Sequence, residues 1–285
     1  MAGTALSLES KDKVRDDLSS ILASAVKYGM LVENPTEGVR LPHDKRGKKR
    51  MEPHITPQQF EQLLSRMREP YATMVYVAVW SALRISELIG LRWEDVRSWV
   101  LVDDEGNERI CYGLTVDERY CRGDWSEPKS LASNATVDIP RRVYERIHGM
   151  QLLTVTVRAG RAMRKHRVVK ADGRNDLVFR SVKPGKPMRD NNILGRVIKP
   201  AARAINLPWI NWRCLRTSCP TRMVESGANP KDVQAQLRHS RTSTTMDIYA
   251  QFVTESQRRA VSRMVAMADA RQAAQGAVAS GQRPN

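Results

Sequence analysis

The chain has 285 residues, 41% of them hydrophobic, which is enough for one large domain with a smaller one beside it. Lysine and arginine number 47 against 31 acidic residues, so the formal net charge is +16 and the expected partner is a polyanion, most simply nucleic acid. No apolar run approaches the ~18 residues of a membrane span, and the first residues are too polar for a signal peptide. We therefore expect a cytoplasmic protein without a membrane partner.

Charge alone leaves one weaker alternative open, a basic protein with no role on nucleic acid. The 4 cysteines form no C-x-x-C pair and have no histidine at metal-ligand spacing. They are expected to be reduced thiols.

The N-terminal region contains one predicted helix, over residues 8–31, whose apolar residues recur at intervals of three and four. Asn34 and Pro35 end it. The basic segment from Lys45 to Arg50 has no periodicity and is typical of a linker. It is either a solvated charge run or a strap that follows phosphates, and we favour the strap.

A second region opens with a clearly marked helix start. Thr56 can cap the helix, Pro57 takes its first position and Gln59 can close a capping box. An apolar stretch over residues 71–80 follows. It leads into the segment Ser81-Ala-Leu-Arg-Ile-Ser-Glu-Leu-Ile-Gly-Leu-Arg-Trp-Glu-Asp95.

The middle of the chain changes its periodicity. Residues 110–116 are rich in β-formers and residues 135–139 alternate, which predicts a small antiparallel sheet of about three short strands. Helical patterns return from Arg141 to about Val157, before a dense basic run over residues 158–170, and again over residues 193–205. The predicted fold class is mainly α with a small antiparallel β-sheet (α+β).

The stretch from Arg213 to Tyr249 combines residue types suited to phosphate chemistry. Arg213 and Arg216 stand three apart, a lone His239 follows, and Tyr249 comes ten residues later. Arginine presents a fork of donors that matches phosphate oxygens. Tyrosine can act as a covalent nucleophile, and histidine can handle a proton beside it. The sequence contains no carboxylate motif that would hold two catalytic metal ions, so we expect neither a metal nor another cofactor.

Three segments of this stretch, in order, resemble the active-site region of the tyrosine recombinases, the phage integrase family. Arg213-Cys-Leu-Arg216 is similar to the His-x-x-Arg box of that family, and Leu237-Arg-His239-Ser240 to its Leu-Gly-His-Ser box. Thr244-Thr-Met-Asp-Ile-Tyr249 is similar to its Thr-Thr-x-x-x-Tyr segment. Residues 81–95 resemble the first box, Gly-Leu-Arg-x-x-Glu-Leu-x-x-Leu, and residues 127–136 resemble a turn that carries a lysine.

The resemblance, over roughly residues 12–265, implies a domain organisation. Residues 1–44 would be a partial helical core-binding domain, shorter than in full-length members, and about forty residues rarely bury a core of their own. Residues 45–54 would be the basic linker, residues 55–271 the catalytic domain and residues 272–285 a disordered tail.

The resemblance also implies a reaction, the recombination or integration of DNA through a 3′-phosphotyrosyl intermediate. Tyr249 would attack the phosphate, Lys129 would protonate the leaving oxygen, and His239 would bond the phosphate and assist Tyr249. The partner would be double-stranded DNA bound by a homo-tetramer, in which the helix after Thr254 docks on a neighbouring protomer. No small-molecule substrate is expected.

The remaining cations would clamp the phosphate. Arg84 and Arg216 are the expected clamp, with Arg213 as a further donor and Glu87 as the buried support of Arg84. The complete set of expected catalytic residues is Arg84, Lys129, Arg213, Arg216, His239 and Tyr249.

Four positions depart from the family pattern. Arg213 stands where most members have histidine, and arginine cannot act as a base near neutral pH. Ala82 and Arg238 each replace a glycine, and Pro220 falls inside the helix that carries Arg216. A catalytically weak or inactive prophage-type remnant that only binds DNA is therefore the alternative to an active enzyme.

Overall fold

The computed structural model describes residues 6–39, 53–121, 123–128, 134–169, 173–180, 187–240, 242, 245–246, 262 and 264–267. Contacts divide the chain into two compact units, Met1–Met51 and Glu52–Asn285. Most of the expected docking helix and the whole expected tail, residues 272–285, lie outside the described residues. The described part is mainly helical with small antiparallel sheets, which confirms the predicted fold class.

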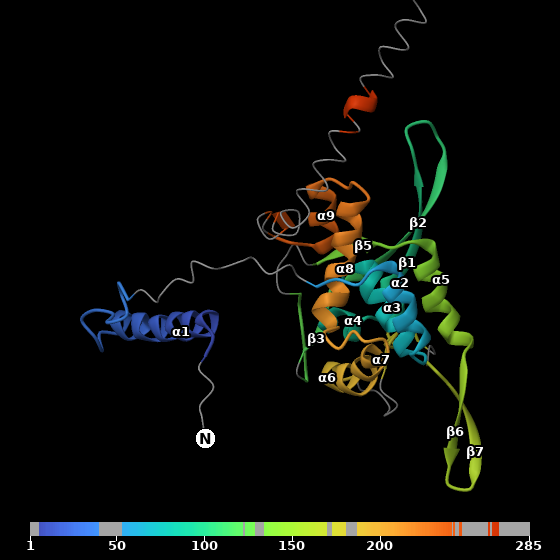
Figure 1. Cartoon of the computed structure of the whole chain (residues 1–285), viewed down its shortest axis with the longest axis horizontal. Coiled ribbons are helices and arrows are strands. Elements are labelled where there is room, and N and C mark those ends of the chain that lie inside the picture. Colours follow the sequence, from blue (N-terminus) through green and yellow to red (C-terminus); the bar gives the residue numbers. More distant parts are fainter. Residues whose placement is uncertain are drawn as a thin grey trace, which may run out of the picture. The chain divides into compact units, whose positions relative to one another are not determined.

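The first unit consists mainly of helix α1 (Leu8–Lys27), which the Ser7 side chain caps by accepting a hydrogen bond from the Ser10 N–H (Figure 1). The helix ends at Lys27, earlier than the predicted residue 31. Asn34 Nδ2 then donates to the Ser19 carbonyl at 3.1 Å, which folds the following turn back on the helix. The apolar stripe of α1 stays largely in solvent, with Leu18 47% and Ile21 65% exposed.

The second unit begins with three helices, α2 (Pro57–Ser65), α3 (Tyr71–Ser81) and α4 (Ile85–Gly90). Thr56 and Gln59 form the predicted capping box at the start of α2. Ala82 ends α3 with a left-handed backbone, φ 54°, at the position where the family pattern has glycine. This tight turn is what brings Arg84 to the start of α4 directly after α3.

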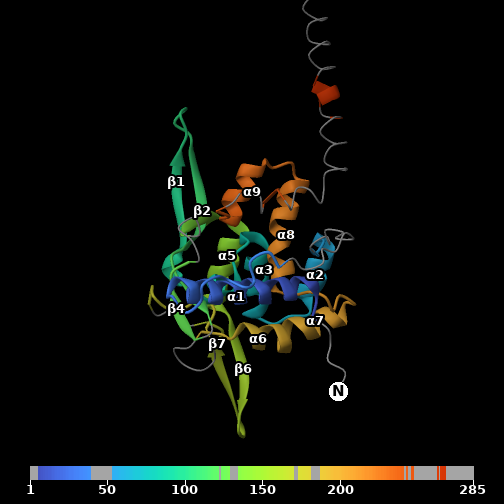
Figure 2. The ribbon, with the colours of Figure 1, turned by 90° about the vertical axis from the view of Figure 1, so that its left-hand side faces the viewer.

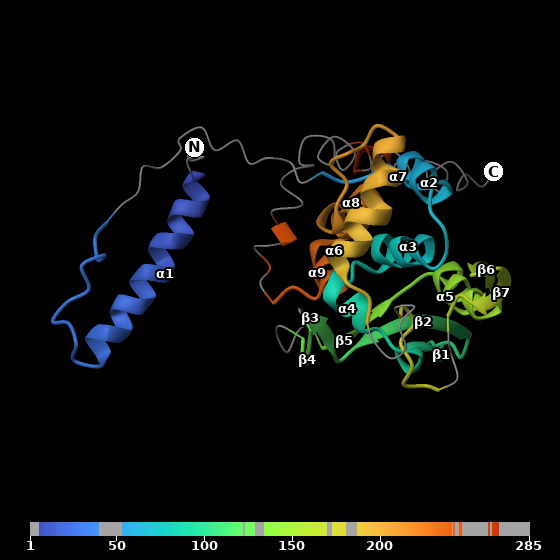
Figure 3. The same ribbon diagram turned by 90° about the horizontal axis from the view of Figure 1, so that it is seen from below.

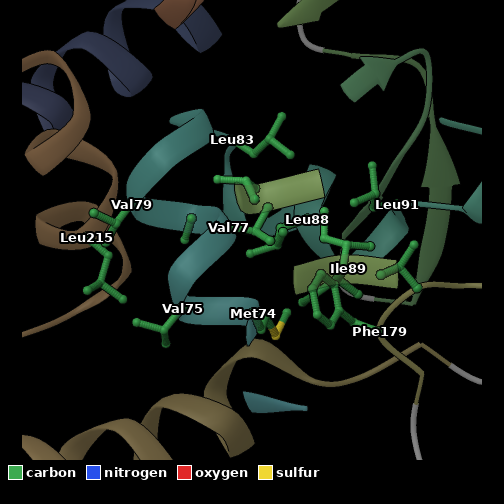
Figure 4. Close-up of a cluster of buried hydrophobic side chains, with 14 of the residues drawn as sticks. Met74, Val75, Val77, Val79, Leu83, Leu88, Ile89, Leu91, Phe179 and Leu215 are labelled. Atoms are coloured by element: carbon green, nitrogen blue, oxygen red, sulfur yellow. The ribbon is translucent and has the colours of Figure 1, made fainter. Parts of the chain in front are cut away.

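Helix α3 is the centre of this unit and packs against α8 and α5. Seen from below, it lies between the antiparallel sheet and helices α7 and α8 (Figure 3). Its apolar side chains are buried on several sides at once, so they join the other helices into one core. Figure 4 shows members of this core: Met74, Val75, Val77, Val79, Leu83, Leu88, Ile89, Leu91, Phe179 and Leu215.

The predicted three-stranded sheet is confirmed, with strand order β1 (Val96–Val102), β2 (Glu108–Val116) and β5 (Ala135–Asp138). Gly113 is required in β2, since a Cβ there would lie 2.7 Å from Thr136 and 2.8 Å from Trp99. A separate ribbon, β3 (Arg119–Cys121) with β4 (Asp124–Ser126), packs on α4. The segment with Lys129 follows β4 and lies outside the described residues.

The predicted helix from Arg141 to about Val157 is wrong in its last part. Helix α5 (Arg141–Gly149) and the 3-10 turn η3 (Met150–Leu152) end before Thr154. Strands β6 (Thr154–Ala159) and β7 (Ala162–Arg167) follow, so much of the basic run is one arm of a β-ribbon. The alternation of threonine and valine over residues 154–157 is the strand signal that the helical interpretation overlooked.

The remaining helices complete the unit. The predicted helix over residues 193–205 consists of α6 (Asp190–Ile193), the π-helical turn η4 (Leu194–Ile198) and α7 (Lys199–Ala204). Then come α8 (Trp212–Glu225) and α9 (Pro230–Leu237), which contact each other. No helix in the described part of the chain is both long enough and apolar enough to cross a membrane.

Candidate active site

The site begins where α4 begins, with Arg84 and Glu87. Arg84 precedes the first helical residue, so its N–H is free to donate to Glu87 Oε2 at 2.7 Å. The Arg84 guanidinium also donates through Nη1 to Glu87 Oε1 at 2.9 Å. The Glu87 side chain is buried and that of Arg84 is 30% exposed, which confirms Glu87 as the buried support that aims Arg84 outward.

Arg238 approaches the same carboxylate from the end of α9. Its Nη2 donates to Glu87 Oε2, and both side chains are buried. Burial alone would raise the pKa of the Glu87 carboxyl, but the charges and hydrogen bonds of Arg238 and Arg84 outweigh it and hold that pKa below its usual value. Glu87 is therefore an ionised link between two helices that lie far apart in the sequence.

The hydrogen bonds at the end of α9 explain why the backbone of Arg238 has a left-handed conformation, with φ 53°. The Arg238 N–H donates to the Ala235 carbonyl, and the His239 N–H donates to the Gln234 carbonyl. These two bonds form a Schellman motif, whose first residue beyond the helix adopts a left-handed conformation and is usually glycine. Arginine takes this position here, and its ion pair with Glu87 offsets part of the backbone cost.

Arg216 reaches the site from the first half of α8, which Asn211 caps through the Cys214 N–H. Its Nη2 donates to the Leu237 carbonyl at 3.0 Å, at the end of α9. Its Nη1 is covered and has no hydrogen-bond partner among the described residues. Burial and the nearby charge of Arg84 together lower the pKa of Arg216 to about 10, although Glu87 opposes them. Arg216 thus remains a cation at neutral pH, and its Nη1 can still donate a hydrogen bond to an acceptor such as a bound anion.

His239 follows Arg238 at the end of the Schellman motif and shares a hydrogen bond between its Nδ1 and Thr245 Oγ1 at 3.2 Å. Burial, together with the charges of Arg216, Arg84 and Arg238, lowers the pKa of His239 to about 4. The imidazole is therefore neutral at pH 7. A neutral imidazole can accept a hydrogen bond at one nitrogen while it donates at the other.

The structure thus brings together Arg84, Arg216 and His239, three of the expected catalytic residues. Arg213 also lies on α8, one turn before Arg216, but its side chain is exposed. Lys129 and Tyr249 lie outside the described residues, so their places in the site remain predictions.

Pro220 does lie inside α8, as the sequence indicates. It has no N–H, so the Arg216 carbonyl lacks the intrahelical hydrogen bond that residue 220 would otherwise donate. Two hydroxyls of the same helix bond to other carbonyls: Thr217 Oγ1 donates to Arg213 at 2.8 Å, and Ser218 Oγ donates to Cys214 at 2.9 Å. The helix remains continuous through the proline.

Sequence reasoning missed Arg238 as a partner of Glu87 and treated it only as a replacement for glycine. The only available signal was the arginine itself, in a place where the family pattern has no side chain. Its partner lies 151 residues away in the sequence, and no local pattern identifies such a pair.

Chemically, the cluster has an excess of fixed positive charge. Among the described residues, Arg84, Arg216 and Arg238 surround the carboxylate of Glu87, and the neutral His239 lies beside them. Guanidinium groups offer planar, paired donors to a tetrahedral anion. The site is therefore suited to bind a phosphate group.

Known proteins match this chain in sequence. A sequence model of the phage integrase family matches residues 134–255, a range that includes α8, α9 and His239. The integrase of Mycobacterium phage L5 is 23% identical over 252 residues, which is 86% of this chain and 59% of that protein. The prophage integrase IntR of Escherichia coli K12 is 24% identical over 244 residues, 84% of this chain and 56% of that protein. The chain therefore spans less than two thirds of the length of these relatives.

A solved structure matches the fold. The Tn1549 transposon integrase in complex with transposon right end DNA aligns with a TM-score of 0.63 at 21% identity, over 92% of this chain and 81% of that one. The helical body with its small antiparallel sheet is thus the catalytic fold of integrases. In sequence over residues 134–255 and in its fold, the chain matches the phage integrase family, the tyrosine recombinases.

Proposed function

We propose that this protein breaks and rejoins double-stranded DNA at specific sites by metal-free transesterification, for recombination or integration. The observation that carries the proposal is the convergence of Arg84, Arg216 and a neutral His239 on one cationic site, with Glu87 fixing the first arginine. Charge accumulates on the nonbridging oxygens of a phosphodiester during transfer, and fixed donors stabilise it without reorganising.

In the proposed step, the Tyr249 hydroxyl gives its proton to the neutral His239, its oxygen attacks the phosphorus, and the bond to the 5′ oxygen breaks. The product is a 3′-phosphotyrosyl link and a free 5′-hydroxyl, and Lys129 supplies the proton of that hydroxyl. Arg84 and Arg216 hold the nonbridging oxygens, with Arg213 as a further donor. Attack of a 5′-hydroxyl on the link reverses the step, so strands are rejoined without another energy source. Two such rounds, in a homo-tetramer on DNA, complete an exchange.

A pool of nicked duplexes of randomised sequence tests the proposal. A short strand end released beside a nick diffuses away, so the covalent protein–DNA complex accumulates and survives denaturation. We expect such a complex with the wild-type protein and none with Tyr249→Phe. If the wild-type protein binds these duplexes but matches Tyr249→Phe, the enzymatic proposal fails.

The alternative is a DNA-binding remnant that no longer cuts. It is favoured by the arginine at position 213, which cannot act as a base, and by Pro220, which removes a backbone bond next to Arg216. It predicts salt-sensitive DNA binding without the covalent complex. The same experiment therefore decides between the two functions.

A further inference from the structure

The ribbon of β6 and β7 is one of the parts of the second unit that the proposed chemistry does not use. Its strands pair from Thr154 with Arg167 to Ala159 with Ala162, and Gly160, at φ 65°, allows the tight turn between them. All side chains of β7 are exposed. The ribbon projects beyond the helices, at the end of the unit away from α9 (Figures 1 and 2). Isolated two-stranded ribbons are marginally stable, so a bound partner would add to the stability of this one.

The pairing register sorts the side chains of the ribbon by face. Residues directly opposite each other share a face, and residues two apart on one strand share it too. One face therefore carries Arg158, Lys165 and Arg167, and Thr154 and Thr156 lie among them. Arg164 and His166 belong to the other face. We call the first of these the cationic face.

The positive charge of the cationic face indicates a negatively charged partner. Residues 154–167 contain no aspartate or glutamate. The ion pairs within the described part of the chain do not include Arg158, Lys165 or Arg167. Alternate residues of a strand lie about 6.8 Å apart and diagonal neighbours about 7–8 Å, so the cations stand in a file with regular spacing. Like charges at such spacing repel one another until an anion with repeated charges neutralises them.

We propose that the cationic face binds the phosphate backbone of duplex DNA away from the reactive phosphate; this rests on the proposed function. Each DNA strand presents a phosphate about every 3.4 Å of the helix axis, and arginine, lysine and threonine side chains are common donors to these oxygens. Because the ribbon lies at the end of the unit away from α9, its contact adds affinity and takes no part in the chemistry. It extends the DNA site beyond the cluster around Glu87.

Neighbouring residues of β7 provide a matched test. Lys165 is on the cationic face and Arg164 on the other, and both are exposed. We expect Lys165→Ala to reduce the slope of log K against log salt by about 0.9, the value for one lost phosphate contact, on a duplex of arbitrary sequence. Lys165→Ala with Arg167→Ala should reduce it by about 1.8, and Arg164→Ala should leave it unchanged. Thermal unfolding checks that each variant is folded.

Three outcomes overturn the assignment: an unchanged slope for Lys165→Ala, an equal decrease for Arg164→Ala, and a change of oligomeric state without a change of slope. The last outcome would assign the face to a protein partner. The covalent complex with nicked DNA is measured separately, at saturating protein. A slope difference without a covalent complex would support the DNA contact and refute the proposed function. A covalent complex without a slope difference would support the proposed function and refute the DNA contact of the ribbon.

Discussion

Glu87 determines how the individual side chains of the site work. Its carboxylate holds Arg84 through two hydrogen bonds and Arg238 through a third, so it fixes the first of these cations and joins α4 to α9. The pair of Arg84 and Glu87 was predictable because the two residues stand one helical turn apart in a family box. Arg238 was not, because its contact with Glu87 exists only in the folded chain.

Replacement of Arg84 tests its role at the level of one residue. Arg84→Ala should slow formation of the covalent complex about 100- to 1000-fold, because one preorganised donor to a developing oxyanion is worth about 3–4 kcal/mol. Glu87 keeps Arg238 as its partner, so the variant should fold. Single-turnover rates on nicked DNA measure the effect. Arg203→Ala, an exposed cation of α7, is the control, and an equal loss there would contradict the role of Arg84.

The pKa of His239 gives a second prediction for a single residue. It is about 4 in the folded protein and about 6.5 in the unfolded chain, so the unfolded chain takes up the proton first as the pH falls. The contribution of His239 to the free energy of unfolding is thus complete above pH 6.5 and is lost toward pH 4.

Urea unfolding of the wild-type protein and His239→Gln between pH 7 and 4.5 measures this contribution. The unfolding free energy of the wild-type protein minus that of His239→Gln should decrease as the pH falls. Asp95, whose pKa burial raises to about 6, acts in the opposite direction, but it is present in both proteins and cancels. A difference that is independent of pH would contradict the depressed pKa.

At the scale of elements, helix α8 positions the site and also anchors the start of the second unit. The Ile55 N–H donates to Ser218 Oγ at 3.0 Å, and Ser218 is fully buried. One hydroxyl thus connects the chain entering α2 to the helix that carries Arg216. The sequence indicates both helices, but the bond between them spans 163 residues and depends on packing alone.

Ser218→Ala should reduce the free energy of unfolding by about 1–3 kcal/mol, because it leaves the buried Ile55 N–H without an acceptor. The matched control is Ser226→Ala near the end of the same helix, where an exposed hydroxyl donates to the Met223 carbonyl. It should change stability by no more than about 0.5 kcal/mol. Equal losses in the two variants would contradict the anchoring role of Ser218.

The accuracy of sequence reasoning differed between elements for physical reasons. The start of α2 was predicted because its capping box is local, and the three-stranded sheet because its strands alternate clearly. The β6–β7 ribbon was missed because a helical pattern was extended past Gly149 into residues 154–157. Strand pairing between residues 154 and 167 depends on a turn at Gly160, which the basic composition of this segment obscures.

At the scale of the whole molecule, the distribution of charge relates the two proposals. The net charge of +16 suits a polyanion, but it does not say which cations bind and which react. The buried cluster around Glu87 is suited to one phosphate, whereas the exposed cationic face of the ribbon is suited to a row of them. We therefore expect variants of the cluster to lose chemistry and variants of the ribbon to lose salt-dependent affinity.

We propose that the cations around Glu87 hold one DNA phosphate while the phosphoryl group is transferred to Tyr249. Mass spectrometry of the covalent complex, after nuclease and protease digestion, tests this most directly because it locates the bonded residue. We predict a nucleotide attached through a 3′ phosphate to the peptide that contains Tyr249. A nucleotide on any other residue, or attachment through a 5′ phosphate, would rule out Tyr249 as the nucleophile that forms a 3′-phosphotyrosyl link.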